Sequence, residues 1–148
     1  MRALRAAVVL AVLAADRATK LWALGKLRGR GPVAVFPFFD LAYARNTGAS
    51  FGLGTGANRL FAGVSAGLIV FLLRLMSRWP RENVWLQAGG ALVLAGALGN
   101  LYDRLAYGAV VDFLDVHRFA VCNLADWSIS AGALMLAWGL REARPAVA

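Results

Sequence analysis

Four long apolar stretches divide the chain, and each has a length suited to a helix that crosses a bilayer. A helix rises 1.5 Å per residue, so about 20 residues cross the hydrocarbon. We expect helices at about 3–24, 59–77, 84–104 and 121–141. Small residues recur in the middle two stretches, where they would let neighbouring helices approach closely. They include Gly63, Gly67, Gly89, Gly90 and Gly96.

The first stretch admits two interpretations. Arg2 and Arg5 precede the apolar run Ala6–Ala15, a pattern typical of a secretory signal peptide. The alternative is a retained helix, which we favour because Asp16 and Lys20 are four residues apart and can pair on one helix face. Pairing lowers the cost of burying both charges, and a cleaved segment has no use for the pair.

Two segments outside the apolar stretches, 25–58 and 105–120, form loops on one side of the predicted bundle. Phe39, Leu41 and Tyr43 alternate with other residues, which indicates a strand with one apolar face. We therefore expect a small amphipathic sheet on the membrane surface between the first and second helices. Segment 105–120 is expected to be an apolar outer loop. The predicted fold is an all-α membrane protein with four transmembrane helices and this extracytoplasmic sheet, in one domain over 1–148.

Composition supports a membrane protein. Hydrophobic residues make up 60% of the 148 residues and the mean hydropathy is +0.62, whereas soluble domains are about half apolar. The net charge of +8 does not indicate nucleic-acid binding, because the basic residues flank the apolar stretches. Four spans place both termini on one side. Basic residues are denser there, on short segments, which favours cytoplasmic termini.

Two aspartates stand where charge is costly. Asp112 and Asp126 lie in or beside apolar segments, where an ionised group costs roughly 2.5–3.5 kcal/mol and is a functional candidate by default. Asp112 precedes Asp126 by fourteen positions, which allows the chain to fold back and bring the carboxylates together. Two adjacent carboxylates share one proton, and such a pair can activate water and polarise a carbonyl. The alternative is an Asp126 that caps a helix and an unrelated, solvated Asp112.

Other polar residues could assist this chemistry. Asn100 and Arg104 share a helix face, and Arg104 could orient a substrate carbonyl, balance the carboxylates, or reach lipid headgroups. Asn46 and Gly48 could bind peptide backbone or simply form a turn. The spacing of these residues does not decide among these roles.

Rival chemistries have weaker support. Cys122 is the only cysteine and His117 the only histidine, so a Cys–His nucleophile is possible but a zinc ligand set is incomplete. Magnesium held by aspartates is harder to exclude; the candidate ligands are Asp103, Asp112, Asp115 and Asp126. The same carboxylates could also serve a proton-coupled transporter, although the chain has no inverted repeat.

Five motifs together resemble the lipoprotein signal peptidases, also called type II signal peptidases. They are Asp16-Arg17-Ala18-Thr19-Lys20, Asn46-Thr47-Gly48-Ala49-Ser50-Phe51, Gly99-Asn100-Leu101-Tyr102-Asp103-Arg104, Val110-Val111-Asp112-Phe113-Leu114-Asp115 and Asn123-Leu124-Ala125-Asp126. The motifs follow the family's order from the first helix to the last. Cys122, Leu124 and Trp127 depart from the family's commoner residues and affect the expected shape of the pocket.

The resemblance implies an aspartic endopeptidase of the bacterial inner membrane, with a β-cradle on the outer surface. It would cleave a prolipoprotein just before its diacylglyceryl-modified cysteine, as a monomer and with no metal or other cofactor. Asp112 and Asp126 would be catalytic, and Asp103 would hold Arg104 in place. The resemblance also assigns pocket-lining or supporting positions to Asp16, Lys20, Asn46, Gly48, Asn100, Arg104 and Asn123.

Overall fold

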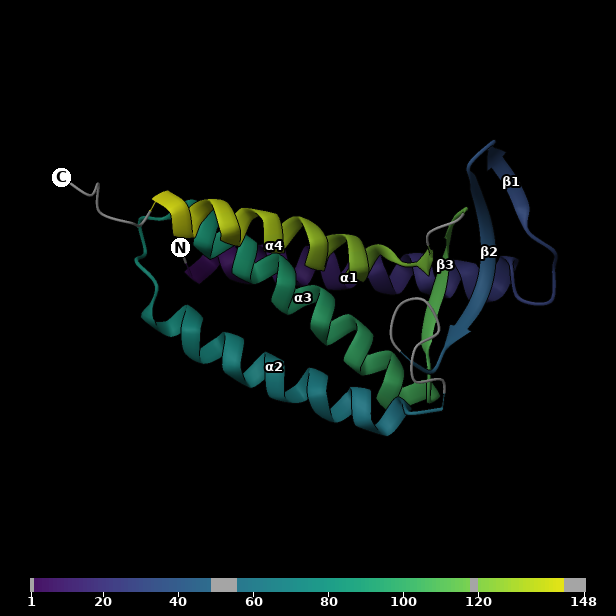
Figure 1. The fold of residues 1–148 in the computed structure, drawn as a ribbon, viewed down its shortest axis with the longest axis horizontal. Helices are drawn as coiled ribbons and strands as arrows, with labels where there is room; N and C mark the ends of the chain where they lie inside the picture. Colours follow the sequence, from purple (N-terminus) through teal and green to yellow (C-terminus); the bar gives the residue numbers. More distant parts are fainter. Residues whose placement is uncertain (1, 49–55, 118–119, 143–148) are drawn as a thin grey trace.

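The computed structural model describes residues 2–48, 56–117 and 120–142 (Figure 1). Its helices are α1 (Arg2–Lys26), α2 (Asn58–Arg78), α3 (Val84–Tyr107) and α4 (Leu124–Glu142). They run side by side, and α3 packs against each of the other three. A small sheet lies across one end of the bundle, while α1 begins and α4 ends at the other (Figure 1).

The helix boundaries follow the predicted stretches, with two differences. Helix α3 continues to Tyr107 and ends at Gly108, whose φ of 71° is the left-handed conformation that glycine adopts most readily. Helix α4 begins at Leu124 rather than at 121, because Asn123 caps it. The Asn123 side chain accepts a hydrogen bond from Asp126 N at 3.0 Å, and Asp126 accepts one from Asn123 N at 3.1 Å. This reciprocal pair is a capping box.

The sheet was predicted to form between the first two helices only, and this is wrong. Two of its strands come from the segment between α1 and α2, and two from the segment between α3 and α4. Its antiparallel order is β1-β2-β3-β4, with β1 (Val33–Phe36), β2 (Phe39–Asn46), β3 (Val110–Val116) and β4 (Ala120–Cys122). Thus 105–120, expected to be an apolar loop, supplies the inner strand β3. Strand β3 is buried at four consecutive positions, 110–113. A strand covered on both faces does not alternate, so the period-2 signal is missing.

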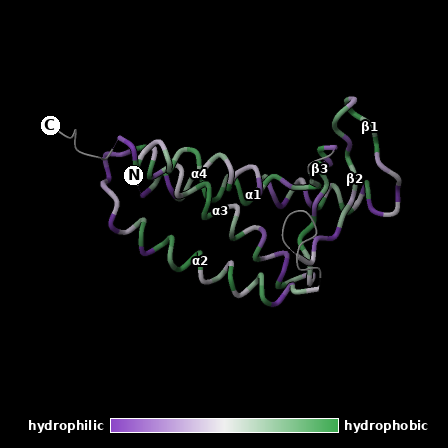
Figure 2. The backbone as a smooth tube through the Cα atoms, viewed as in Figure 1, coloured by the Kyte–Doolittle hydropathy of each residue, from purple (hydrophilic) through white to green (hydrophobic). Residues whose placement is uncertain are grey.

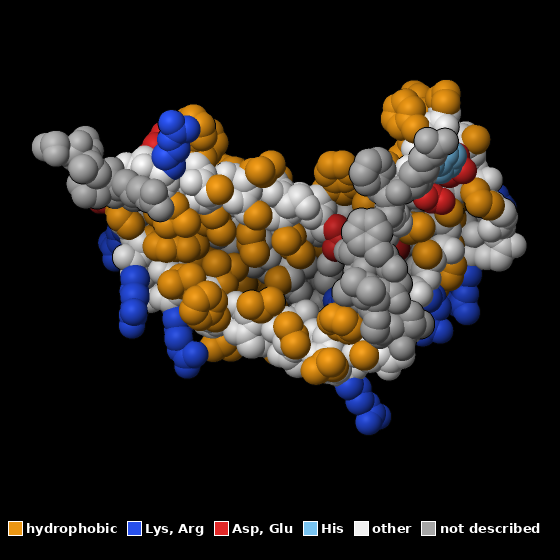
Figure 3. Space-filling model, in the orientation of Figure 1, with side chains coloured by type: hydrophobic (Ala, Val, Ile, Leu, Met, Phe, Trp, Pro, Cys, Tyr) orange, Lys and Arg blue, Asp and Glu red, His pale blue; other side chains and the backbone are white. Residues whose placement is uncertain are grey.

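The bundle buries polar as well as apolar residues, and much of its outer surface is apolar. Its buried polar residues include Asp16, Lys20, Gln87, Asn100, Asp103 and Asn123. Large apolar side chains are exposed along the helices, among them Leu10, Leu68, Phe71 and Leu134. Figure 2 shows that hydrophobic residues recur along the helices. Figure 3 shows hydrophobic side chains over the middle of the molecule and basic side chains towards both ends. Among the described residues, α2 and α3 are long and apolar enough to cross a membrane. The protein is therefore a membrane protein.

Glycines hold α3 against α4. A Cβ on Gly89 would lie 2.8 Å from Gly132 O, and one on Gly132 would lie 2.6 Å from Gly89 O. These distances are too short for any other residue, so the two backbones meet directly. The expectation of close packing is confirmed for α3. It is wrong for α2, where a Cβ on Gly63 or Gly67 meets no described atom within 4 Å.

Candidate active site

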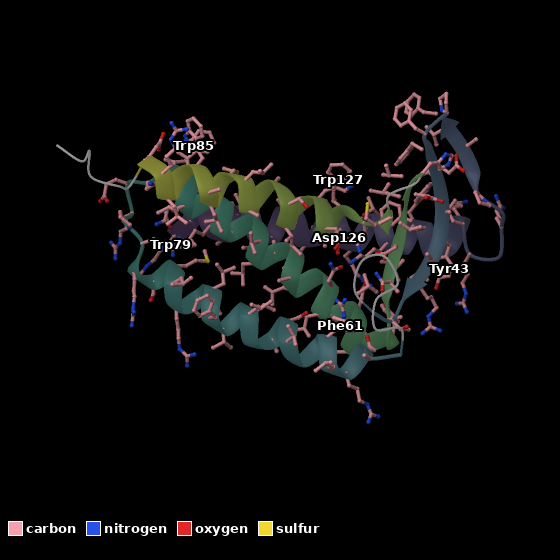
Figure 4. The ribbon with its side chains drawn as sticks, viewed as in Figure 1. Tyr43, Phe61, Trp79, Trp85, Asp126 and Trp127 are labelled. Carbon is pink, nitrogen blue, oxygen red and sulfur yellow. The ribbon has the colours of Figure 1, made fainter. Side chains whose placement is uncertain are left out.

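The first turn of α4 presents Asp126 to the interior of the bundle. Its position is fixed by the capping box with Asn123, which uses Asp126 Oδ2 and the Asp126 N–H. The other oxygen, Oδ1, accepts a hydrogen bond from Asn100 Nδ2 on α3 at 2.8 Å. Figure 4 shows Asp126 beside the space between α4 and α2. Capping is therefore one role of Asp126, but its carboxylate also reaches another helix.

Asp112 lies on β3 and is 2% exposed. It is not the solvated loop residue of the alternative prediction. Its Oδ1 accepts a hydrogen bond from Asn123 Nδ2 at 2.6 Å, and its Oδ2 accepts one from Asn46 Nδ2 at 3.0 Å. Asn46 lies at the end of the neighbouring strand β2. The fold thus brings the end of β2 and the residue that caps α4 to one carboxylate on β3.

Two asparagine side chains connect the carboxylates. Asn123 donates to Asp112, Asn100 donates to Asp126, and Asn123 Nδ2 also donates to Asn100 Oδ1 at 3.1 Å. Asp112 and Asp126 are therefore members of one hydrogen-bonded cluster, joined through Asn100 and Asn123. Each carboxylate accepts a hydrogen bond from at least one amide side chain.

Burial raises the pKa of Asp112 to about 7, and the nearby negative charge of Asp126 acts in the same direction. Hydrogen bonds from Asn46 and Asn123 oppose this rise, as does the positive charge of Lys20. A carboxyl group with this pKa is protonated in a large fraction of molecules at neutral pH. This is the behaviour expected of one member of a pair that shares a proton.

A buried ion cluster lies behind the carboxylates. Lys20 Nζ is 2.9 Å from Asp16 Oδ2 and 3.0 Å from Asp103 Oδ2, which confirms the predicted Asp16–Lys20 pair. The resemblance implied that Asp103 holds Arg104 in place, but the structure has no ion pair between these two described residues. The second oxygen of Asp103, Oδ1, lies 3.6 Å from Arg17 Nη1 instead. Asp103 lies one position from Arg104 on α3, and neighbouring residues on a helix point in different directions.

Arg104 instead lies on the Asn100 side of α3. Its Nη2 donates to Gly48 O at 3.1 Å and its Nη1 to Asn100 O at 3.4 Å. Gly48 N is bound to Asn46 Oδ1 at 3.0 Å, so Asn46 and Gly48 form a local turn next to the cluster. The rest of that motif, Ala49, Ser50 and Phe51, lies outside the described residues. The predicted Asn46, Gly48, Asn100 and Arg104 therefore come together.

A cavity of about 410 Å³ opens beside Asp126. Asp126, Asn46, Asn100 and Arg104 line its polar end. Its apolar wall extends along α2 and includes Phe61, Ser65, Leu68, Leu72 and Leu75. Figure 4 shows Phe61 on α2 across from Asp126. Sequence reasoning did not identify the α2 residues as part of the site, because an apolar helix gives no sign of which side faces lipid and which faces a cavity.

The rival sites are dispersed. His117 Nε2 pairs with Asp40 at 2.9 Å, whereas Cys122 Sγ contacts Leu114 O at 3.5 Å. They do not form a nucleophile pair. The four aspartates considered as magnesium ligands do not form one group. Asp103 is paired with Lys20, and Asp115 lies on the opposite face of β3 from Asp112.

The sequence profile of the family described as Signal peptidase (SPase) II matches residues 8–141. The chain belongs to the signal peptidase II family. A lipoprotein signal peptidase of Yersinia pseudotuberculosis is 40% identical over 144 residues, covering 92% of this chain and 84% of that protein. One from Moorella thermoacetica is 39% identical over 134 residues, covering 90% of this chain and 89% of that protein.

Two solved structures are similar to this chain in fold. A bacterial membrane enzyme determined at 1.9 Å has a TM-score of 0.84 and 27% identity, and the match covers 95% of this chain and 94% of that one. Another, determined at 2.3 Å, has a TM-score of 0.83 at the same identity, covering 93% and 87%. The matches extend over both the helices and the sheet, so the carboxylate cluster lies within a shared fold.

Proposed function

We propose that this chain is an aspartyl endopeptidase that cleaves the signal peptide of a diacylglyceryl-modified prolipoprotein, just before the lipidated cysteine. The observation that carries the proposal is the convergence of Asp112 and Asp126 on the Asn100–Asn123 pair. Asp126 and Asn100 lie at the polar end of a largely apolar cavity. Family membership supports a peptidase acting on lipoprotein precursors. The aspartyl mechanism is inferred from the carboxylate geometry.

In this mechanism Asp112 holds the shared proton and Asp126 is ionised. The raised pKa of Asp112 supports that assignment. Asp126 accepts a proton from water as the water attacks the scissile carbonyl carbon, while Asp112 transfers its proton to the carbonyl oxygen. A tetrahedral diol forms. As the C–N bond breaks, Asp126 passes the proton it took from water to the leaving amine, and Asp112 regains a proton from one diol hydroxyl, so no covalent enzyme adduct is made.

Arg104 and the cavity would position the substrate. Arg104 Nε is buried and has no hydrogen-bond partner among the described residues, so a peptide carbonyl could accept a bond from it. The long apolar wall along α2 suits apolar substrate segments, and an opening between helices would allow entry from the bilayer. A lipid-modified precursor combines a peptide bond and acyl chains, which fits a cavity with one polar and one apolar end.

The fold and the charge pattern support a proposal for the location. We infer a bacterial inner-membrane protein, a monomer with four spans in a single integral domain. Both termini would be cytoplasmic, because the arginines at that end of the bundle lie on short segments. The sheet and the carboxylates at the opposite end would then face the outer surface. No cofactor is required by a mechanism in which two carboxylates activate water.

The test compares three aspartate variants in detergent, with a lipid-modified and an unmodified precursor as substrates. Asp112→Asn and Asp126→Asn are expected to lower kcat by at least about a thousandfold for the lipid-modified precursor. Asp115→Asn is the matched control, since Asp115 lies on the same strand but faces away from Asp112. Retained turnover in either folded catalytic variant would eliminate the aspartyl mechanism.

Two further outcomes identify other functions. Loss of activity in EDTA, restored by magnesium, would indicate a metal-dependent reaction. Proton-linked solute uptake into proteoliposomes, without peptide cleavage, would indicate a transporter. Preference for the unmodified precursor would contradict the proposed substrate while leaving the peptidase chemistry in place.

A further inference from the structure

Lys20 is fully buried in the centre of the protein, and its three N–H donors have three acceptors. They are Asp16 Oδ2 at 2.9 Å, Asp103 Oδ2 at 3.0 Å and Asn100 Oδ1 at 2.9 Å. Lys20 comes from α1, whereas Asn100 and Asp103 come from α3. The ammonium group therefore joins two helices and leaves no donor for a substrate.

Each carboxylate bound to Lys20 also holds one backbone N–H from a different element. Asp103 Oδ2 accepts Val111 N at 3.2 Å, and Asp16 Oδ1 accepts Ala125 N at 3.0 Å. Val111 directly precedes Asp112, and Ala125 directly precedes Asp126. The same cluster thus fixes the backbone one residue before each candidate catalytic carboxylate.

The third contact of Lys20 sets the orientation of the amides. An ammonium group can only donate, so Asn100 must turn its oxygen towards Lys20 and its Nδ2 towards Asp126. Asn123 must likewise turn its oxygen towards the Asp126 N–H, and its Nδ2 towards Asp112. If Asn100 were reversed, its oxygen would face the Asp126 carboxylate and repel it.

We propose that Lys20, Asp16 and Asp103 form a positioning centre that sets the spacing of Asp112 and Asp126 and the orientation of Asn100. Asp16, Lys20 and Asp103 do not line the cavity in which the scissile carbonyl and the attacking water would lie. They would therefore act through other residues, as positioning residues. This inference rests on the proposed function, because it assumes that the spacing of these two carboxylates matters to the reaction.

Stability alone accounts poorly for such a centre. Removing two carboxylates and an ammonium group from water is costly, and well-packed apolar residues often replace buried ion pairs without loss of stability. Apolar residues could not, however, accept the Val111 and Ala125 N–H groups or orient Asn100. Small misplacements of reacting groups cost as much as about 100-fold in rate, so positioning gives the buried charges a purpose.

The test uses variants of similar size that differ in whether they can accept a hydrogen bond. Asp103→Asn and Asp16→Asn keep an oxygen for the backbone N–H, whereas Asp103→Leu and Asp16→Leu do not. With the lipid-modified precursor, we expect each Leu variant to lose about 100-fold in kcat and each Asn variant to retain at least ten times the kcat of its Leu counterpart. KM should change by less than about threefold, because the cavity wall is untouched.

Arg5→Met is the control for a purely structural effect. Arg5 also links α1 to other segments, through Gln87 and Met76 O, but at the far end of the bundle. It should lower the unfolding temperature and leave kcat unchanged. If the Leu variants lower only the unfolding temperature, or if paired Leu and Asn variants have equal kcat, the positioning proposal is wrong.

Two arrangements keep the result interpretable. If the Leu variants do not fold, the Asn variants decide the question: kcat within tenfold of the unmodified chain supports the proposal, and a folded, inactive Asn variant contradicts it. Asp126→Asn is measured in parallel. Activity in Asp126→Asn would reject the proposed function itself, whereas an inactive Asp126→Asn with unaffected Leu variants would reject the positioning centre alone.

Discussion

Asn123 Nδ2 donates to Asp112 Oδ1 across 2.6 Å, while the oxygen of the same side chain caps helix α4. One residue therefore stabilises a helix and contacts a candidate catalytic carboxylate. The two roles use different atoms, so they can be separated by substitution.

Replacing Asn123 should distinguish these roles. Asn123→Ala removes both the cap and the donor, and should cost about 1 kcal/mol of stability together with most of the activity. Asn123→Ser retains a capping oxygen but cannot reach Asp112 with an N–H, so stability should recover and kcat should remain low. Thermal unfolding and turnover of the purified variants check this. Recovery of full activity in Asn123→Ser would show that the bond to Asp112 is unimportant.

The pKa of Asp112 predicts the pH dependence of the reaction. Because the proposed mechanism requires Asp112 to be protonated, kcat/KM should fall as pH rises, with a midpoint near the pKa of about 7. The midpoint belongs to the coupled pair of carboxylates. A rate that stays constant from pH 5 to pH 9 would contradict this assignment of the proton.

Stability should follow the same titration. The pKa of Asp112 is raised in the folded chain above its usual 3.8, so its neutral form is favoured by folding. That contribution is fully present below about pH 4 and is lost as pH rises through 7. Asp112→Asn, which cannot ionise, should therefore be more stable than the unmodified chain at pH 8, by at most about 4 kcal/mol, and should lose this advantage near pH 4. Unfolding temperatures at the two pH values measure the difference.

The glycine contact between α3 and α4 should tolerate no side chain. Gly89→Leu places atoms where Gly132 O lies, and should destabilise the bundle by at least about 1–3 kcal/mol. Gly63→Leu on α2 is the matched control, because its Cβ meets no described atom within 4 Å. Equal unfolding temperatures for the two variants would mean that the α3–α4 contact is not close.

The apolar wall of the cavity should be sensitive to bulk on one side of α2 only. Ser65 lines the cavity, whereas the adjacent Ala66 is exposed. Ser65→Phe should raise KM for the lipid-modified precursor by at least about tenfold, a loss of about 1.4 kcal/mol in binding. Ala66→Phe should have no such effect. Equal KM values would place the substrate elsewhere.

Local patterns were enough to predict the four apolar helices, the Asp16–Lys20 pair and the candidate carboxylates. Helical spacing is a local property, and charged residues in apolar segments are conspicuous without coordinates. The same spacing placed Asn100 and Arg104 on one side of α3, where the structure has them beside Asp126.

How these parts meet could not be predicted from local patterns and became known from the folded chain. Strand β3 could not be recognised in the sequence because it is covered on both faces. That burial removes the alternation of apolar and polar residues that would have revealed it. The partners of Asp103, and the attachment of Lys20 to the residues before Asp112 and Asp126, depend on contacts between α1, α3, β3 and α4. Contacts between segments so far apart in the sequence arise from packing, and no local pattern records them.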